Sequence, residues 1–111
     1  MVERILEGKG IFGVHLKKRH FRDKAQIVFS SNEDIEIDGL SDDPPIIIEI
    51  TAILRDIDKI NVFLKKKKFV ENNFDLKFRG FFVASGTERT RDQLAEVNIL
   101  LRKNQSELLN L

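Results

Sequence analysis

The run from Ile46 to Ile50 constrains the fold more than any other part of this sequence. It holds four isoleucines, and only Glu49 interrupts them. A short β-branched run of this kind is typical of a central strand that is buried on both faces. We expect the strand to continue through Thr51 and Ala52. A carboxylate on such a strand costs several kcal/mol unless it is paired or coordinated, so we expect Glu49 to have a partner.

Length and composition limit the kind of protein that can surround this strand. The chain has 111 residues, which predicts a single domain. Its residues are 41% hydrophobic and 33% charged, which excludes a disordered chain. The formal net charge is +1, so any surface for a polyanion must come from local clusters of cations. No cysteine is present, which excludes disulfides, thiolate metal ligands and a thiol nucleophile.

The sequence also indicates where the protein works. No stretch approaches the roughly 20 apolar residues that a membrane helix needs, and the charged segment 1–10 does not resemble a signal peptide. We therefore expect a cytoplasmic protein with no membrane partner. Abundant charge together with the absence of Cys and Trp is typical of a thermophilic source.

The pattern of apolar residues predicts strands before the run and helices after it. One or two helical turns are expected at 2–6. The adjacent prolines Pro44 and Pro45 exclude helix from an expected loop at 40–45. A helical period predicts a helix at about 55–72, and a capping box from Thr90 to Gln93 predicts a second helix at about 90–104. Alternating or continuous apolar residues predict further strands at 14–21, 25–30, 34–39, 77–84 and 107–111. The expected fold is α/β, a mixed β-sheet flanked by helices.

Two carboxylates stand on the two strands of the predicted hairpin. Alternation places Asp38 on the face opposite Ile37, and it places Glu49 and Thr51 together on one face of the next strand. If these faces coincide, the two carboxylates meet near the strand ends. Such a pair suits Mg²⁺, which also keeps waters and takes phosphate oxygens. An ion placed there can activate water and neutralise charge on a phosphodiester.

This arrangement resembles the PD-(D/E)XK nuclease-like superfamily, which includes restriction endonucleases and archaeal Holliday-junction resolvases. The signature of the superfamily is an Asp ending one strand of a hairpin and a (D/E)-x-K on the next, followed by helix, strand, helix and strand. Asp38 and Glu49 match the first two positions, and the predicted order over 55–111 matches the rest. The chain is similar in particular to a poorly characterised archaeal branch. The resemblance implies a restriction-endonuclease-like core at 34–111, preceded by an N-terminal hairpin region at 1–33.

The resemblance also implies a site. Asp38, Glu49 and Thr51 occupy its catalytic positions, and Asp38 and Glu49 would bind Mg²⁺, with Mn²⁺ as a substitute. Thr51 stands where the superfamily has a lysine that positions or polarises the attacking water. Two functions stay open: Mg²⁺-dependent hydrolysis of DNA, or a non-catalytic nucleic-acid-binding or assembly module that has lost this lysine.

A lysine from the helix at 55–72 is one way to replace the missing cation. The candidates are Lys59, Lys65 and Lys66. Their positions place Lys59 near the charged end of that helix, and Lys65 and Lys66 away from its main buried stripe.

Two basic clusters predict contact with DNA. Lys17, Lys18 and Arg19 form one, and Lys65 and Lys66 belong to the other. The alternative is that they are a solvated strand edge and a solvated helix face. Val62 and Phe69 form a second apolar stripe on the same helix, which predicts either packing in the core or a homodimer interface.

Overall fold

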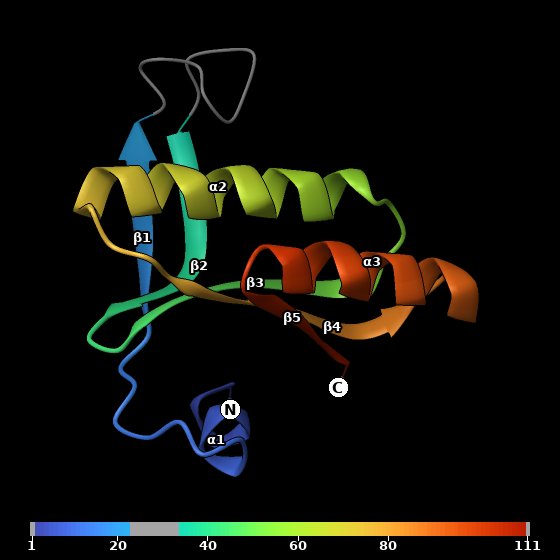
Figure 1. Ribbon diagram of the computed structural model, residues 1–111, viewed down its shortest axis with the longest axis horizontal. Coiled ribbons are helices and arrows are strands. Elements are labelled where there is room, and N and C mark those ends of the chain that lie inside the picture. Colours follow the sequence, from blue (N-terminus) through green and yellow to red (C-terminus); the bar gives the residue numbers. More distant parts are fainter. Residues whose placement is uncertain (1, 23–33, 111) are drawn as a thin grey trace.

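The computed structural model describes residues 2–22 and 34–110. Figure 1 shows their arrangement, and the strand expected at 25–30 lies outside them. The described helices are α1 (Val2–Gly8), α2 (Asp58–Phe74) and α3 (Arg91–Lys103). The described strands are β1 (Lys17–Arg22), β2 (Asp34–Asp42), β3 (Pro45–Leu54), β4 (Arg79–Thr87) and β5 (Ser106–Asn110).

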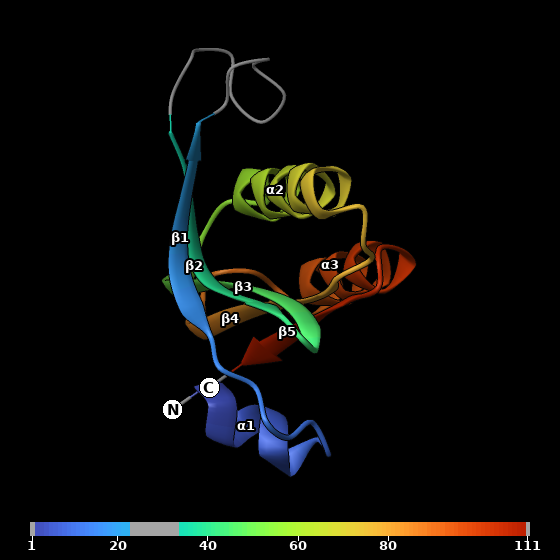
Figure 2. The ribbon, with the colours of Figure 1, turned by 90° about the vertical axis from the view of Figure 1, so that its left-hand side faces the viewer.

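The five strands form one mixed sheet with the order β1-β2-β3-β4-β5. β1, β2 and β3 pair antiparallel, whereas β3, β4 and β5 pair parallel. α2 and α3 make the crossovers that parallel strands require. They cover one face of the sheet, and α1 lies against the other (Figure 2). The predicted α/β class, with a mixed sheet flanked by helices, is confirmed.

β3 contributes to two hydrophobic cores, one on each face of the sheet. Ile47 belongs to the core under α2 and α3, which we call the α2–α3 core. Ile46 and Ile48 belong to the core against α1, which we call the α1 core. All three side chains are at most 2% exposed. The prediction of a strand buried on both faces is therefore correct for Ile46–Ile48, whereas Ile50 at the end of the run is 48% exposed and Ala52 is exposed as well.

The loop expected at 40–45 is mostly strand. Leu40, Ser41 and Asp42 pair with the first residues of β3, so the chain reverses within two residues. Their polar and proline-rich sequence suggested a loop, but Leu40 and Ser41 are buried. Pro45 is tolerated because it is the first residue of its strand, where a missing N–H matters least.

The limits of α2 differ from the predicted 55–72. The helix begins at Asp58, whose backbone N–H donates to the Asp56 carboxylate at 2.9 Å. It continues past the expected asparagine stop to Phe74, and Asp75 ends it in the left-handed conformation at φ 51°. α3 begins as predicted, with the Thr90–Gln93 capping box formed in both directions.

The second apolar stripe of α2 packs inside the domain. Val62 and Phe69 are partly buried and contact the α2–α3 core. The Phe69 ring meets the Phe21 ring of β1 edge-on, with centroids 5.8 Å apart. Because these contacts already cover the stripe, it gives no support to the expected homodimer.

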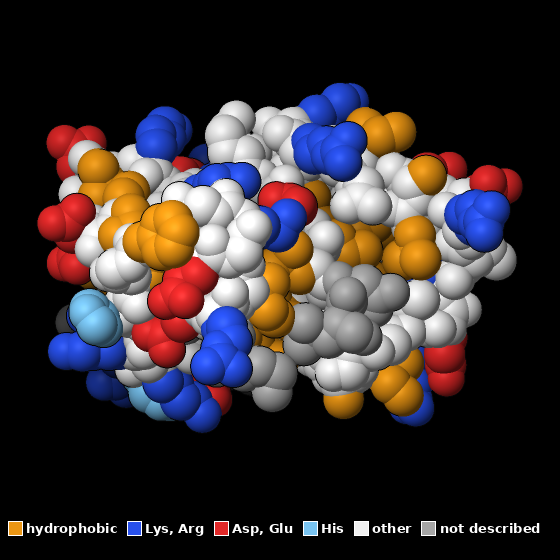
Figure 3. All heavy atoms as spheres, turned by 90° about the horizontal axis from the view of Figure 1, so that it is seen from below, with side chains coloured by type: hydrophobic (Ala, Val, Ile, Leu, Met, Phe, Trp, Pro, Cys, Tyr) orange, Lys and Arg blue, Asp and Glu red, His pale blue; other side chains and the backbone are white. Residues whose placement is uncertain are grey.

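Among the residues that the structure describes, no helix is long and apolar enough to cross a membrane. On the face that carries α1, basic and acidic side chains are interspersed, and hydrophobic side chains reach the surface between them (Figure 3). This mixture agrees with the net charge of +1.

Gly80 of β4 tests the packing of the α2–α3 core. A Cβ on Gly80 would lie 2.9 Å from Cζ of Phe63 and would also meet the Ser106 hydroxyl. We expect Gly80→Ala to lower the free energy of unfolding by about 1–3 kcal/mol. Gly86 in the same strand has no atom within 4 Å of its Cβ position, so Gly86→Ala is the matched control and should leave stability unchanged or slightly higher. Urea denaturation measures both, and equal effects would contradict this packing.

Candidate functional site

β2 carries one extra residue just after Ile37. Lys17 pairs with Leu40 and Arg19 pairs with Ile37, so two steps along β1 match three steps along β2. Ile37 and Leu40 both enter the α2–α3 core, although residues three apart in a regular strand face opposite sides. A bulge of this kind bends its strand. The bend falls at Asp38.

The bend opens a fork between β2 and β3. Their ladder ends at Gly39 and Ile48, and β2 then turns away to run beside β1 (Figure 1). Asp38 and Glu49 are the next residues along the two strands. One Asp38 carboxylate oxygen accepts a hydrogen bond from the backbone N–H of Ile50 at 2.8 Å. This bond takes the place of strand pairing and holds Asp38 at the opening of the fork.

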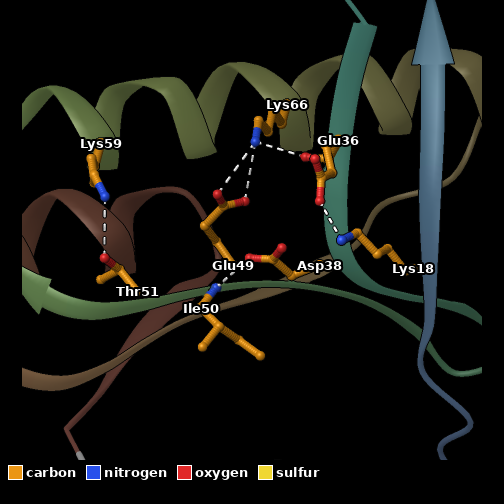
Figure 4. Close-up of polar contacts among 8 residues, drawn as sticks. All are labelled: Lys18, Glu36, Asp38, Glu49, Ile50, Thr51, Lys59 and Lys66. Carbon is orange, nitrogen blue, oxygen red and sulfur yellow. Dashed lines mark hydrogen bonds and ion pairs between the residues drawn. The ribbon is translucent and has the colours of Figure 1, made fainter.

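Lys66 of α2 is the partner of Glu49. Its ammonium nitrogen lies 3.3 Å from both carboxylate oxygens of Glu49. It also donates to the backbone carbonyl oxygen of Glu36 at 2.7 Å. Lys66 is only 7% exposed, and the Glu49 side chain is 23% exposed. Figure 4 shows the ammonium between the two strands of the fork. The sequence predicted that Glu49 needs a partner, and α2 provides it.

The expectation that Lys66 lies away from the buried stripe, on a DNA-binding surface, was wrong. Lys66 and Lys67 are both buried, whereas Lys65 and Lys68 are exposed. Lys67 pairs with Glu71 at 3.1 Å. The buried residues of α2 follow the spacing Ile60, Phe63, Lys66, Lys67 and Val70. The expectation failed because it assumed that lysine side chains face the solvent.

A second lysine of α2 reaches the other polar residue of this strand face. Lys59 donates to the Thr51 hydroxyl at 3.2 Å. Lys59 and Lys66 are about two turns apart on α2, and they contact Thr51 and Glu49, which share one face of β3 (Figure 4). Between α2 and β3 lies a cavity of about 300 Å³, the α2–β3 cavity, which all four of these side chains line.

Burial and charge act in opposite directions on Glu49. Burial raises the pKa of the Glu49 carboxyl above its ordinary value, the ammonium of Lys66 opposes this rise, and the charge of Asp38 adds to it. The net direction is upward. Because the folded-state pKa is raised, the stability that Glu49 contributes is greatest at low pH and falls as pH rises through that pKa.

The donor set of the fork suits a metal that brings its own further ligands. Within residues 2–22 and 34–110, no group of three or more His, Asp or Glu side chains could hold a metal ion. Asp38 and Glu49 supply two carboxylates, and Mg²⁺ commonly takes one or two carboxylates with waters and phosphate oxygens. The pair therefore fits Mg²⁺ bound together with a phosphate, and the sharing of one ion by these two residues stays a prediction.

The basic cluster of β1 lies at the outer edge of the sheet. Its three residues are exposed, but they are not equivalent. Lys18 forms an ion pair with Glu36 of β2, and this pair lowers the pKa of the Glu36 carboxyl. The Arg19 guanidinium lies over the Phe21 ring, 5.1 Å from its centroid. Lys17 and Arg19 make no ion pair among the described residues, so they are the members best placed to meet an anion.

A scan against protein-family models matches none of them, and searches of curated proteins and of solved structures return no match to this chain. The case for a function therefore depends on the geometry of the fork and its lysines.

A pH titration tests the surroundings of Glu49. We expect its side-chain carboxyl carbon, followed by NMR, to titrate at a higher pH than is usual for a glutamate, because burial disfavours the charged form. In Lys66→Met the midpoint should rise further, since the opposing positive charge is lost. Lys65→Met, which removes an exposed charge one residue away, should have little effect. A midpoint for Glu49 that Lys66→Met leaves unchanged would contradict the ion pair.

Proposed function

We propose that the fork between β2 and β3 is a site for Mg²⁺-dependent hydrolysis of phosphodiester bonds in DNA. The observation that carries this proposal is the buried ammonium of Lys66 facing the Glu49 carboxylate next to Asp38. Two carboxylates and one ammonium at the opening of a strand fork are the groups that metal-assisted attack of water on a phosphodiester requires.

The element order supports a restriction-endonuclease-like fold for the chain. An antiparallel hairpin, β2–β3, is followed by helix, strand, helix and strand. This is the order that the PD-(D/E)XK resemblance requires, and the acidic pair stands where the hairpin strands separate. The short α1 packs on the opposite face of the sheet from α2 and α3 (Figure 2).

Each residue of the fork has a distinct role in this proposal. Asp38 and Glu49 would hold the ion, Mg²⁺ or its substitute Mn²⁺. When bound, the ion supplies Lewis acidity that lowers the pKa of a water and neutralises phosphate charge. Lys66 would replace the lysine that the superfamily has at the position of Thr51. Its bond to the Glu36 carbonyl is independent of Glu49, so the ammonium stays at the fork when Glu49 takes another partner.

Thr51 and Lys59 extend the site along β3. The hydroxyl of Thr51 already accepts a hydrogen bond from Lys59 and can also orient a water, but it carries no charge. Lys59 lies nearer the mouth of the α2–β3 cavity, since its side chain is exposed where that of Lys66 is buried. In this proposal Lys59 contacts a phosphate of the substrate, and Lys66 acts at the reacting group.

A non-catalytic module is the second candidate, and two observations favour it. Thr51 replaces the motif lysine, and the Glu49–Lys66 pair satisfies both charges without a metal. In such a protein the fork would stabilise the attachment of α2, and DNA would be bound without being cut.

A cleavage assay separates these candidates. With Mg²⁺ or Mn²⁺ and single-stranded, duplex and branched DNA, we expect the wild-type protein to cut at least one substrate. Glu49→Gln and Lys66→Met should each reduce the rate by about 10²-fold or more, because each removes a group aimed at the reacting phosphate. Lys103→Met, which removes an exposed charge at the end of α3, is the control and should retain activity. Thermal melting of every variant distinguishes lost chemistry from lost folding.

The same assay contains the outcome that would refute catalysis. Thr51→Lys restores the usual motif on β3. If that variant cuts DNA and the wild-type protein does not, the natural chain is a binding module on a nuclease-like frame.

DNA binding itself is tested through its dependence on salt. In this proposal Lys17 and Arg19 on the edge of β1 contact phosphates. We expect Lys17→Gln and Arg19→Gln each to reduce the slope of log K against log salt by about 1. Lys103→Gln, at the end of α3, should leave the slope unchanged. Fluorescence anisotropy with labelled duplex DNA measures the slopes. If Lys17→Gln and Arg19→Gln both keep the slope of the wild-type protein, as Lys103→Gln should, the β1 edge is not the contact surface.

A further inference from the structure

A second cavity lies away from the fork and has a different character. Its volume is about 630 Å³, and it opens at the amino ends of β3, β4 and β5. It shares no lining residue with the α2–β3 cavity. This size is within the range of pockets that bind small molecules. We call it the strand-end cavity.

One wall of the strand-end cavity is apolar and rigid. Pro44, in the turn of the β2–β3 hairpin, and Pro45, the first residue of β3, contribute to this wall, and Phe78 lines it from the segment before β4. Proline rings have no side-chain donor and little freedom, and Phe78 is only 1% exposed. A flat apolar group could lie against this wall without displacing a hydrogen-bonded side chain.

The rest of the lining is rich in cations. Lys77, Arg79 and Arg102 line the cavity, and Glu107 is the only acidic residue among its lining. The Glu107 carboxylate is already occupied, because Lys9, from outside the lining, lies 2.6 Å from one of its oxygens. Arg79 lies 3.6 Å from the other oxygen.

The remaining two cations have no such neutralisation. Within the described part of the chain, Lys77 and Arg102 form no ion pair. Arg102 stands in the last turn of α3, where a cation offsets the helix dipole. Lys103 also offsets the helix dipole, but it does not line the cavity. The helix dipole therefore does not explain why Arg102 stands where it lines the cavity.

We propose that the strand-end cavity binds a small organic phosphate with a flat aromatic ring, which is the chemistry of a nucleoside monophosphate. The ring would lie against the proline wall. The phosphate would be held by Arg102, whose guanidinium group can donate two hydrogen bonds to its oxygens, and by Lys77, with Arg79, which also lies near Glu107, as a third cation. The proposal is independent of the nuclease proposal, because no residue of the fork takes part in it.

The probe is 5′-AMP, titrated into the ¹⁵N-labelled full chain and followed by NMR. We expect the backbone amides of Ile46, Arg79 and Ser106 to shift, and those of Glu49 and Lys66 to stay in place. Arg102→Gln should weaken binding about tenfold, the effect of losing a charge-assisted contact. The matched variant Lys103→Gln, one residue along the same exposed helix end, should bind like the wild type. Adenosine and inorganic phosphate should each bind more weakly than 5′-AMP, because each lacks one half of the ligand.

Three outcomes would overturn the proposal. The first is the absence of shifts at the strand-end cavity with 5′-AMP at millimolar concentration. The second is equal weakening by Arg102→Gln and Lys103→Gln, which would indicate unspecific attraction. The third is tighter binding of a 5′-phosphorylated trinucleotide than of 5′-AMP, which would assign the surface to a nucleic-acid strand end in place of a free nucleotide.

Discussion

The negative charge of Glu49 on a central strand is the constraint on which the site depends. The residues before it on β3, Ile46, Ile47 and Ile48, are buried and serve two cores, so the carboxylate has little contact with water. The charge is tolerated because Lys66 reaches it from α2. Lys66 is itself buried and needs Glu49 and the Glu36 carbonyl to be satisfied. The pair therefore fixes how α2 crosses the sheet, since a shift of the helix by one turn would leave two uncompensated charges.

The bulge in β2 makes this arrangement possible. If β2 were a regular strand with this sequence, Ile37 and Leu40 would face opposite sides of the sheet and one of them would leave the α2–α3 core. With it, both stay buried, and the strand bends where Asp38 stands. The bend ends pairing with β3, and Asp38 accepts the hydrogen bond of the freed Ile50 N–H. The burial of Ile37 and Leu40 thus opens the fork, and the Asp38 carboxylate replaces the backbone hydrogen bond that β3 loses there.

Sequence patterns predicted the features that depend on regular periods. The isoleucine run gave β3, and the capping box gave the start of α3. The charge of Glu49 within that run also predicted a partner, because the cost of burying it is large. The identity of that partner could not be predicted, since the rule that lysines face solvent fails for Lys66. The bulge could not be predicted, because a pattern of alternating residues assumes a regular period of two. The extra residue becomes visible only in the pairing register between β1 and β2.

The energetics of the fork bear on why such a pair is present at all. A buried ion pair contributes little net stability, because desolvation of both charges offsets their attraction, and well-packed apolar residues often do as well. Attachment of α2 alone would therefore be served by a leucine and an isoleucine at the positions of Lys66 and Glu49. The pair is also incompletely buried on the Glu49 side and opens on the α2–β3 cavity, next to Thr51 and Lys59. Stability alone explains neither the charges nor the opening, and both are in keeping with the proposal that the fork receives a phosphate and its metal ion.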